Sequence, residues 1–568
     1  MNQLYYGDNL DIAKRYIKDE SVDLVYLDPP FKSNQDYNVL FQEKNGSQAA
    51  SQIKAFGDTW TWSQEDEGVF AELIVAGGRV ADVMQAFRAF LGPCDMLAYL
   101  VMMAPRLREM RRVMKPTGSI YLHCDPTASH YLKLLMDAVF GPENFRSEII
   151  WKRSYAHSDT KQGLAKHGRI HDVILFYARS GDWFWNPVYS PYDETYLGSE
   201  YRHRTPGGRA YKETDCTAAK PGGDVSYEWR VKRIGSSRWQ VDLDDEWKNP
   251  KDGVEYKAVR PYGGRFWAYS RANMEKFARE GHLIYRSTGM PRIVQYADAM
   301  PGIPLQDIWT DIQPISAKSA ERLGYPTQKP VALLERIISS SCPEGGVVLD
   351  PFCGCGTTIT AAQALGRTWI GIDITHLAIT LMKSRLKDTF GDSVEFTVTG
   401  EPVSVPDAAA LAESDPYQFQ WWALGLVGAR PVEQQKGADR GIDGKIVFMG
   451  DRPGKFETVV ISVKAGHVTA NQVRDLRGVV DREKSSIGVL ISMEKPTKPM
   501  QTEAATAGFF ESETWGREYP KIQLLTVADL LSGKKIDMPP IKQVGATFKK
   551  APKANSRSKS ENKDLFSG

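Results

Sequence analysis

Four residues near the N-terminus, Asp28-Pro29-Pro30-Phe31, combine a carboxylate, backbone carbonyls and an aromatic ring. They follow the apolar run 22–27, which predicts a buried strand. Because neither proline can donate a backbone N–H, the strand must end and the chain must turn here. Carboxylate and carbonyl oxygens accept hydrogen bonds, and an aromatic face stacks on planar rings. The group therefore suits a flat ring that carries an NH₂ group. A plain strand-end turn with a capping Asp is the alternative.

A second chemical element lies more than 300 residues further along, at Asp350-Pro351-Phe352-Cys353-Gly354-Cys355-Gly356-Thr357. It joins the apolar run 347–349 to a helix predicted over 359–365, and its glycines let backbone approach a ligand closely. The next predicted strand, 368–372, leads into Asp373, about where an acid meets ribose hydroxyls in a Rossmann-like fold. No Gly-Lys-Ser/Thr follows these glycines, which argues against a phosphate-cradling P-loop.

The two stretches together resemble the amino-group DNA methyltransferases, which make N6-methyladenine or N4-methylcytosine. Further stretches match that family in the same order: Tyr6-Gly7-Asp8-Asn9, residues 118–125, residues 171–177 and Tyr325-Pro326-Thr327-Gln328-Lys329-Pro330. The resemblance covers about residues 1–180 and 310–400. The catalytic motif precedes the cofactor motif, which is the permuted order of the family's β group.

The resemblance implies an α/β fold, namely a mostly parallel, Rossmann-like methyltransferase sheet that binds S-adenosyl-L-methionine. It also implies a division of the chain: a catalytic half at 1–180 with a helical insertion at about 34–94, a target-recognition region at 181–312 and a cofactor-binding half at 313–400. Residues 541–568 carry seven Lys/Arg and two acids with few apolar groups, so we expect a disordered basic tail.

Site roles follow from the same resemblance. The catalytic motif is Asp28, Pro29, Pro30 and Phe31, in which Asp28 and the Pro29 carbonyl accept the amino hydrogens of an extruded base and Phe31 stacks on it. The expected cofactor contacts are Asp8, Thr327, Lys329, Asp350, Phe352, Gly354, Gly356, Thr357 and Asp373. Asp8 is equally suited to cap the helix predicted over 10–17. Methylation requires no metal. In this family an Asp before Pro-Pro is commoner for adenine and a Ser for cytosine, which favours adenine N6 and keeps cytosine N4 as the alternative.

The middle of the chain has the composition of a nucleic-acid surface. Residues 200–295 hold 19 Lys/Arg against 13 Asp/Glu. Positive charge attracts the phosphate backbone and planar side chains suit base contacts, so we expect double-stranded DNA as partner. The aromatic residues are Trp229, Trp239, Trp247, Trp267, Tyr262 and Tyr269. Arg106, Arg108, Arg111 and Arg112, on a predicted helix, form either a solvated face or phosphate contacts.

Residues 401–540 predict a second α/β domain. Its aromatic-rich helix at 414–427, Asp443 in a turn and a strand that ends at Lys464 resemble the Mrr-like branch of the restriction-endonuclease-like fold. In that branch an Asp and a second acid hold a divalent cation, such as Mg²⁺, that activates water. Ser462 stands in place of the second acid, and Gln420 in place of a helix acid. A hard cation prefers several oxygen ligands. Whether Asp443, Ser462 and Lys464 cleave DNA therefore stays open.

The composition excludes several classes of protein. Hydrophobic content of 42%, charged content of 25% and a net charge of +2 are ordinary for a globular chain. Six cysteines without a CxxC pair disfavour zinc ribbons and disulfide frameworks. No apolar run approaches the ~18 residues of a membrane helix, and no secretory signal is evident. We expect a cytoplasmic enzyme with no membrane partner, and a homodimer stays open. A DNA-binding protein with a dead active site is the alternative from another class.

Overall fold

The structure is a computed structural model, and it describes residues 1–30, 62–155, 167–192, 194–220, 227–234, 238–241, 254–316, 319–323, 325, 327–432, 441–451, 455–540 and 551–553. Phe31 and nearly all of the predicted tail therefore lie outside the described residues. Two compact units divide the chain: Met1–Asn186 with Gln306–Gly568, and Pro187–Leu305. No helix of the described part is long and apolar enough to cross a membrane.

A nine-stranded sheet forms the centre of the first unit. Its strands, in spatial order, are β17 (Ile308–Trp309), β4 (Phe145–Lys152), β5 (His171–Ala178), β3 (Met114–Cys124), β2 (Val22–Leu27), β18 (Val347–Asp350), β19 (Thr368–Asp373), β1 (Asn2–Tyr6) and β20 (Phe396–Thr399). Only β5 runs against its neighbours β3 and β4, and the other pairings are parallel. The predicted mostly parallel sheet is confirmed.

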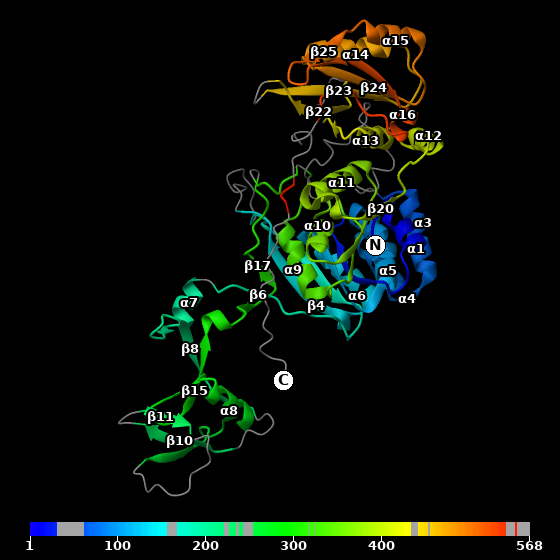
Figure 1. The fold of residues 1–568 in the computed structure, drawn as a ribbon. Coiled ribbons are helices and arrows are strands. Elements are labelled where there is room, and N and C mark those ends of the chain that lie inside the picture. The colour runs from blue at the N-terminus through cyan, green and yellow to red at the C-terminus, as the bar shows by residue number, and fades with distance from the viewer. Residues whose placement is uncertain are drawn as a thin grey trace. The chain divides into compact units, whose positions relative to one another are not determined.

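Helices cover this sheet in two groups, which Figure 1 draws in blue and in green. The N-terminal half supplies α1 (Asn9–Tyr16), α3 (Gln64–Ala76), α4 (Gly78–Leu91), α5 (Asp95–Val113) and α6 (Pro126–Phe140). The other half supplies α9 (Val331–Ser341), α10 (Thr357–Ala364) and α11 (His376–Phe390). Apolar residues of the first group share one core with the central strands, including Leu100, Leu107 and Leu132 against Val25 and Ile120. The described part of the predicted insertion, α3 and α4, belongs to this core.

The second unit, Pro187–Leu305, consists of short strands and two helices. Its elements are β6 (Tyr189–Ser190), α7 (Glu194–Glu200), β7 (His203–Arg204), β8 (Ala210–Asp215), β9 (Thr217–Ala218), β10 (Trp229–Ile234), β11 (Arg238–Val241), β12 (Tyr256–Val259), β13 (Phe266–Trp267), α8 (Arg271–Arg279), β14 (Leu283–Tyr285), β15 (Pro291–Tyr296) and β16 (Ile303–Pro304). Among the aromatic residues of the basic region, Trp229 and Trp267 do not lie at the surface of this unit. Both are buried and form the core that this small unit needs. Tyr262 is exposed, and Trp247 lies outside the described residues.

The C-terminal domain has its own five-stranded sheet, in the order β21 (Arg430–Pro431), β22 (Gly444–Met449), β23 (Phe456–Lys464), β24 (Ile487–Ser492) and β27 (Ile522–Thr526). The pairings up to β23 are antiparallel and the last two are parallel. The remaining elements are α12 (Val405–Ser414), α13 (Pro416–Leu426), α14 (Ala470–Glu483), α15 (Lys498–Ala505), β25 (Phe509–Ser512), β26 (Arg517–Pro520) and α16 (Val527–Leu531). Phe419 and Trp422 of α13 pack into the core of this domain, which explains why that helix is rich in aromatic residues.

Candidate active site

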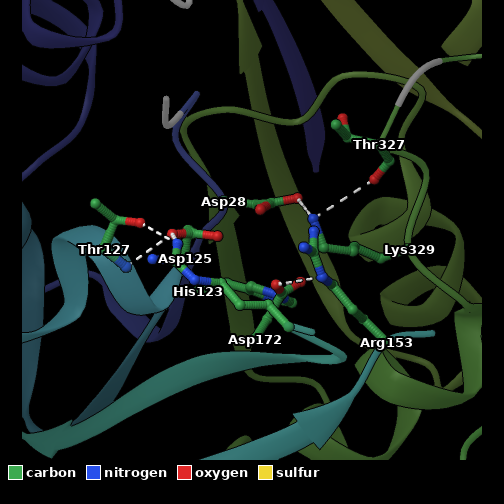
Figure 2. Close-up of polar contacts among 9 residues, drawn as sticks. Asp28, His123, Asp125, Thr127, Arg153, Asp172, Thr327 and Lys329 are labelled. Atoms are coloured by element: carbon green, nitrogen blue, oxygen red, sulfur yellow. Dashed lines mark hydrogen bonds and ion pairs between the residues drawn. The ribbon is translucent and has the colours of Figure 1, made fainter. Parts of the chain in front are cut away.

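The carboxylate of Asp28 lies directly after β2, at the carboxyl end of the strand. It accepts a hydrogen bond from the Lys329 ammonium, with 2.6 Å between Nζ and Oδ2. The two side chains are only 17% and 10% exposed, so water screens this pair little. Figure 2 shows Lys329 directed at Asp28, and dashed lines join the lysine to Asp28 and Thr327. A contact between residues 301 apart thus joins the two halves of the sequence.

The glycine turn begins at the carboxyl end of the neighbouring strand. β18 pairs in parallel with β2, with Val348 opposite Leu24 and Leu349 opposite Val25. Parallel neighbours end at the same edge of a sheet, which is where α/β folds bind their ligands. Asp28 and Asp350 therefore lie on one edge. The negative charge of Asp28 adds to the effect of burial in raising the pKa of Asp350. The structure brings together the two sequence elements that the predicted reaction requires.

Contacts within the chain hold the glycine turn in shape. Gly354 donates its N–H to the Asp373 carboxylate at 2.9 Å, and Gly356 donates to the Cys353 carbonyl at 2.7 Å. Both glycines have positive φ, +49° and +74°, a region that L side chains rarely adopt. A Cβ on Gly354 would lie 3.1 Å from the ring of Tyr325. These contacts fix the backbone of the turn, which lies against the Tyr325 ring.

Two buried carboxylates hold the ends of β18 and β19. Asp350 accepts from the N–H of Phe352, and Asp373 accepts from Gly354 and from both the N–H and hydroxyl of Thr375. Burial raises the pKa of Asp350 to about 7 and that of Asp373 to about 6. The Asp373 oxygens thus bond to the chain itself, and its contact with ribose stays a prediction. Thr357, also expected at the cofactor, is buried and accepts from Arg385 at 3.0 Å.

The raised pKa of Asp350 predicts a pH dependence of stability. The folded chain holds this proton more tightly than the unfolded chain between about pH 4 and pH 7, so stability falls as pH rises through that window. The Asp350→Asn variant has no charge to bury. We therefore expect its free energy of unfolding to fall by roughly 2 to 4 kcal/mol less than that of the wild type as pH rises through this window. Urea unfolding at about pH 5 and pH 8 measures it. An identical pH dependence in wild type and variant would contradict the prediction. Asp373→Asn should reduce the pH dependence less, because the pKa of Asp373 is raised only to about 6.

A buried polar chain beside Asp28 was not foreseen from the sequence. The Tyr26 hydroxyl lies 2.9 Å from Nδ1 of His123, whose Nε2 lies 3.0 Å from Asp172. Arg153 approaches the other Asp172 oxygen at 3.2 Å (Figure 2). Burial opposes ionisation of Asp172, but His123, Lys329 and Arg153 together lower the pKa of its carboxyl. Ionisable side chains inside the apolar stretches 118–125 and 171–177 were the available signal.

Asp8 and Arg106 of α5, for which the sequence left two roles open, contact each other. Asp8 caps α1 by accepting from the N–H groups of Leu10 and Asp11, and its other oxygen pairs with Arg106. Arg106 also donates to Asn9 at 2.6 Å. Neither a solvated face nor a phosphate contact describes this arginine, because its side chain is 15% exposed and tied to the start of α1. A contact of Asp8 with the cofactor stays a prediction.

The predicted nuclease residues also come together, in the C-terminal domain. Asp443 Oδ2 accepts from the Ser462 hydroxyl at 3.1 Å and from the Val463 N–H at 2.7 Å, with Lys464 Nζ 3.8 Å away. Among the described residues, no group of three or more His, Cys, Asp or Glu could hold a metal ion. One carboxylate, already bonded to the chain, does not fit the several oxygen ligands that Mg²⁺ takes. We derive no metal-dependent step from this site.

Comparison with known proteins decides the family. Residues 22–384, more than half of the chain, match the N6_N4_Mtase model, which is described as DNA methylase. The chain belongs to this family. Residues 418–532 match a second model, the NACHT-associated inactive Restriction Endonuclease 1. The predicted fusion of an amino-methyltransferase to a restriction-endonuclease-like domain is thereby confirmed.

The relatives of this DNA methylase include a Type II methyltransferase and a subunit of a Type III restriction-modification enzyme. The Type II methyltransferase M.EcaI of Enterobacter cloacae is 26% identical over 415 residues, 72% of this chain and 75% of that protein. The Type III restriction-modification enzyme StyLTI Mod subunit of Salmonella typhimurium is 27% identical over 379 residues, 64% of this chain but only half of the relative. The solved complex of M1.HpyAVI with SAM is 15% identical and covers 68% of this chain and 99% of that chain. Its TM-score of 0.30 is too low for any conclusion.

Proposed function

We propose that this DNA methylase transfers a methyl group from S-adenosyl-L-methionine to the exocyclic amino group of a DNA base, with adenine N6 preferred and cytosine N4 as the alternative. The observation that carries the proposal is the meeting of Asp28 with the cofactor half of the chain. Lys329 bonds to Asp28, and β18 delivers the glycine turn to the same sheet edge. Transfer requires a nucleophile and a methyl donor held within contact distance, which this edge can provide.

The chain's residues would act on the base by hydrogen bonding. The amino nitrogen is a weak nucleophile because its lone pair is delocalised into the ring. Asp28 and the Pro29 carbonyl accept its two hydrogens, which localises the lone pair toward the methyl group. S-adenosyl-L-methionine, when bound at the turn of 350–357, would supply that group as an electrophilic sulfonium methyl and would leave as the neutral thioether. The amino nitrogen forms the new bond to the methyl carbon and loses one of its two protons, which the Asp28 carboxylate can accept and pass to water. Extrusion of the base from the duplex costs a few kcal/mol, which DNA contacts must offset.

The cysteines of the glycine turn do not serve as nucleophiles in this proposal. Cys353 is buried, and its Sγ lies 3.0 Å from the Ile372 carbonyl, to which the thiol can donate. Burial raises the pKa of the Cys353 thiol well above its ordinary value, which keeps the weakly nucleophilic neutral form. Cys355 is buried as well, against Thr357 and Arg385. A direct transfer without a covalent intermediate fits these surroundings.

Two measurements test the proposal. Purified full-length chain with tritiated S-adenosyl-L-methionine should label double-stranded DNA, and long-read sequencing of DNA from expressing cells should report the base and its sequence context. Absence of label on DNA would favour the binding-protein alternative, and label on RNA alone would overturn the substrate. Modified cytosine in place of adenine would select the alternative base.

We assign target recognition to residues 181–312, because this region separates the two halves of the site in the sequence and because its part 200–295 holds 19 Lys/Arg against 13 Asp/Glu. Trp229 and Trp267 are buried in its core, so exposed aromatic residues such as Tyr262 are the candidates for DNA contact. Whether the chain forms a homodimer stays open, and the mass measured by light scattering would decide it.

Cleavage by the C-terminal domain is the second candidate function, and we predict that it does not occur. Ser462 in place of an acid leaves Asp443 as the one carboxylate beside Lys464 among the residues that the structure describes. Supercoiled plasmid should therefore stay intact with the wild-type chain and Mg²⁺ or Mn²⁺. Plasmid cutting that Asp443→Ala abolishes would contradict this. Ser462→Glu adds the second oxygen ligand, so we expect it to gain Mn²⁺ binding, measured by calorimetry, over the wild type.

A further inference from the structure

Lys329 belongs to the segment whose sequence suggested contacts with the cofactor, yet its ammonium bonds to the catalytic carboxylate. Nζ lies 2.6 Å from Asp28 Oδ2 and 3.5 Å from the Thr327 carbonyl. An ammonium has three donors and no acceptor, so Lys329 cannot itself take a hydrogen from the amino group of a base. Its contact with Asp28 therefore acts on the base only through that carboxylate.

The backbone around the lysine is built to hold it in place. Gln328 donates its side-chain amide to the Glu321 carbonyl at 2.7 Å and accepts from the N–H of Leu323 at 2.8 Å. Glu321 in turn accepts from the N–H of Val331, at the start of α9, at 2.6 Å. Thr327 has φ of +60°, a left-handed conformation that is unfavourable for a β-branched residue. Such strain persists where the surrounding structure fixes the backbone, often at functional sites.

The charges around the lysine favour a fixed position. Besides Asp28, Lys329 is close enough to Asp172 to help lower the pKa of that carboxyl against the effect of burial. Asp172 is buried and also contacts His123 and Arg153 (Figure 2). The ammonium thus faces one carboxylate at the end of β2 and another near the start of β5. This arrangement holds the lysine at the sheet edge that carries Asp28.

We propose that Lys329 is a positioning residue for methyl transfer. By bonding Oδ2 it fixes the rotation of the Asp28 carboxylate, so that Oδ1 is presented to the amino group of the base. Among the residues that the structure describes, no second hydrogen bond to Asp28 is formed. A charge-assisted bond of this length is strong enough to hold the carboxylate orientation. This inference rests on the proposed function, and it moves Lys329 from cofactor binding to orientation of the catalytic acceptor.

The chain offers a matched control at the other end of the same strand. Lys115 bonds to Asp23 of β2 with 2.7 Å between Nζ and Oδ2, and Asp23 also accepts from the N–H of Val347. Lys115→Met therefore removes a lysine–aspartate bond of 2.7 Å, against 2.6 Å for Lys329–Asp28, from the same strand and away from the proposed site. Lys329→Met and Lys329→Arg are the test variants, because Arg keeps a donor for Asp28.

The experiment measures single-turnover methyl transfer to DNA at saturating cofactor, together with cofactor affinity by calorimetry, on full-length chains. Loss of one charge-assisted hydrogen bond predicts a rate reduced about tenfold or more in Lys329→Met, with partial recovery in Lys329→Arg. We expect cofactor affinity to stay within roughly threefold of wild type. Lys115→Met should match the wild-type rate.

Two results would overturn the inference while leaving the proposed function standing. One is a normal saturated rate with weakened cofactor binding in Lys329→Met, which would return the lysine to the cofactor. The other is an equal loss of rate in Lys115→Met, which would make the effect structural. A wild-type chain that transfers no methyl group to DNA would instead remove the proposed function, and the inference with it.

Discussion

Asp28→Ala is expected to lower the single-turnover rate of methyl transfer by about a thousandfold, the upper range for loss of one preorganised polar group at a reacting centre. The carboxylate lies at the end of β2, where it can accept an amino hydrogen and so direct the lone pair toward the methyl group. Cofactor affinity should stay within roughly threefold, because the glycine turn belongs to another strand. Asp28→Asn, which keeps one acceptor oxygen, should show an intermediate rate.

The control for this prediction is Asp23→Ala. Asp23 belongs to the same strand and is buried, but it bonds to Lys115 and to the N–H of Val347 at the opposite end. Its removal should lower the free energy of unfolding by roughly 1 to 3 kcal/mol and leave the rate of the folded chain unchanged. A wild-type rate in Asp28→Ala would show that Asp28 is not the acceptor.

Gly354→Ala is expected to weaken cofactor binding tenfold to about a hundredfold. Its φ of +49° makes any L side chain unfavourable, by roughly 1 to 2 kcal/mol. The new Cβ would also press on the Tyr325 ring at 3.1 Å, so either the ring or the turn must shift. A shifted turn moves the backbone that bonds to Asp373. Calorimetric titration of the variant with S-adenosyl-L-methionine measures the effect.

Gly366→Ala is the control that introduces backbone strain outside the proposed cofactor-binding turn. Gly366 follows α10 with φ of +70°, and a Cβ there would meet no atom within 4 Å. We expect a loss of stability of about 1 kcal/mol in this variant and cofactor affinity equal to wild type. If Gly354→Ala binds the cofactor as tightly as Gly366→Ala does, the glycine turn is not the cradle.

Local sequence signals were sufficient for much of the fold. The apolar runs that became β2 and β18 are bounded by Pro-Pro and by a glycine turn, and both signals act over a few residues. The carboxyl ends of two parallel strands then bring Asp28 and Asp350 to one edge without any knowledge of side-chain contacts. The sequence likewise shows that position 462 holds Ser and not an acid, and this matters because a metal site depends on the type of its ligands.

Pairing between distant side chains could not be read in this way. Arg106 with Asp8, Lys329 with Asp28, and His123 with Asp172 are contacts across strands and helices, and charge alone gives each of them many partners in the sequence. The same limit applies to Trp229 and Trp267. Their side-chain type suits DNA contact, but both are buried because this small unit needs a hydrophobic core. The sequence by itself determined the strands that end at Asp28 and Asp350, their polar ends and the resemblance to the family. Only the tertiary structure decided which charges meet, because that depends on distances set by packing of segments hundreds of residues apart.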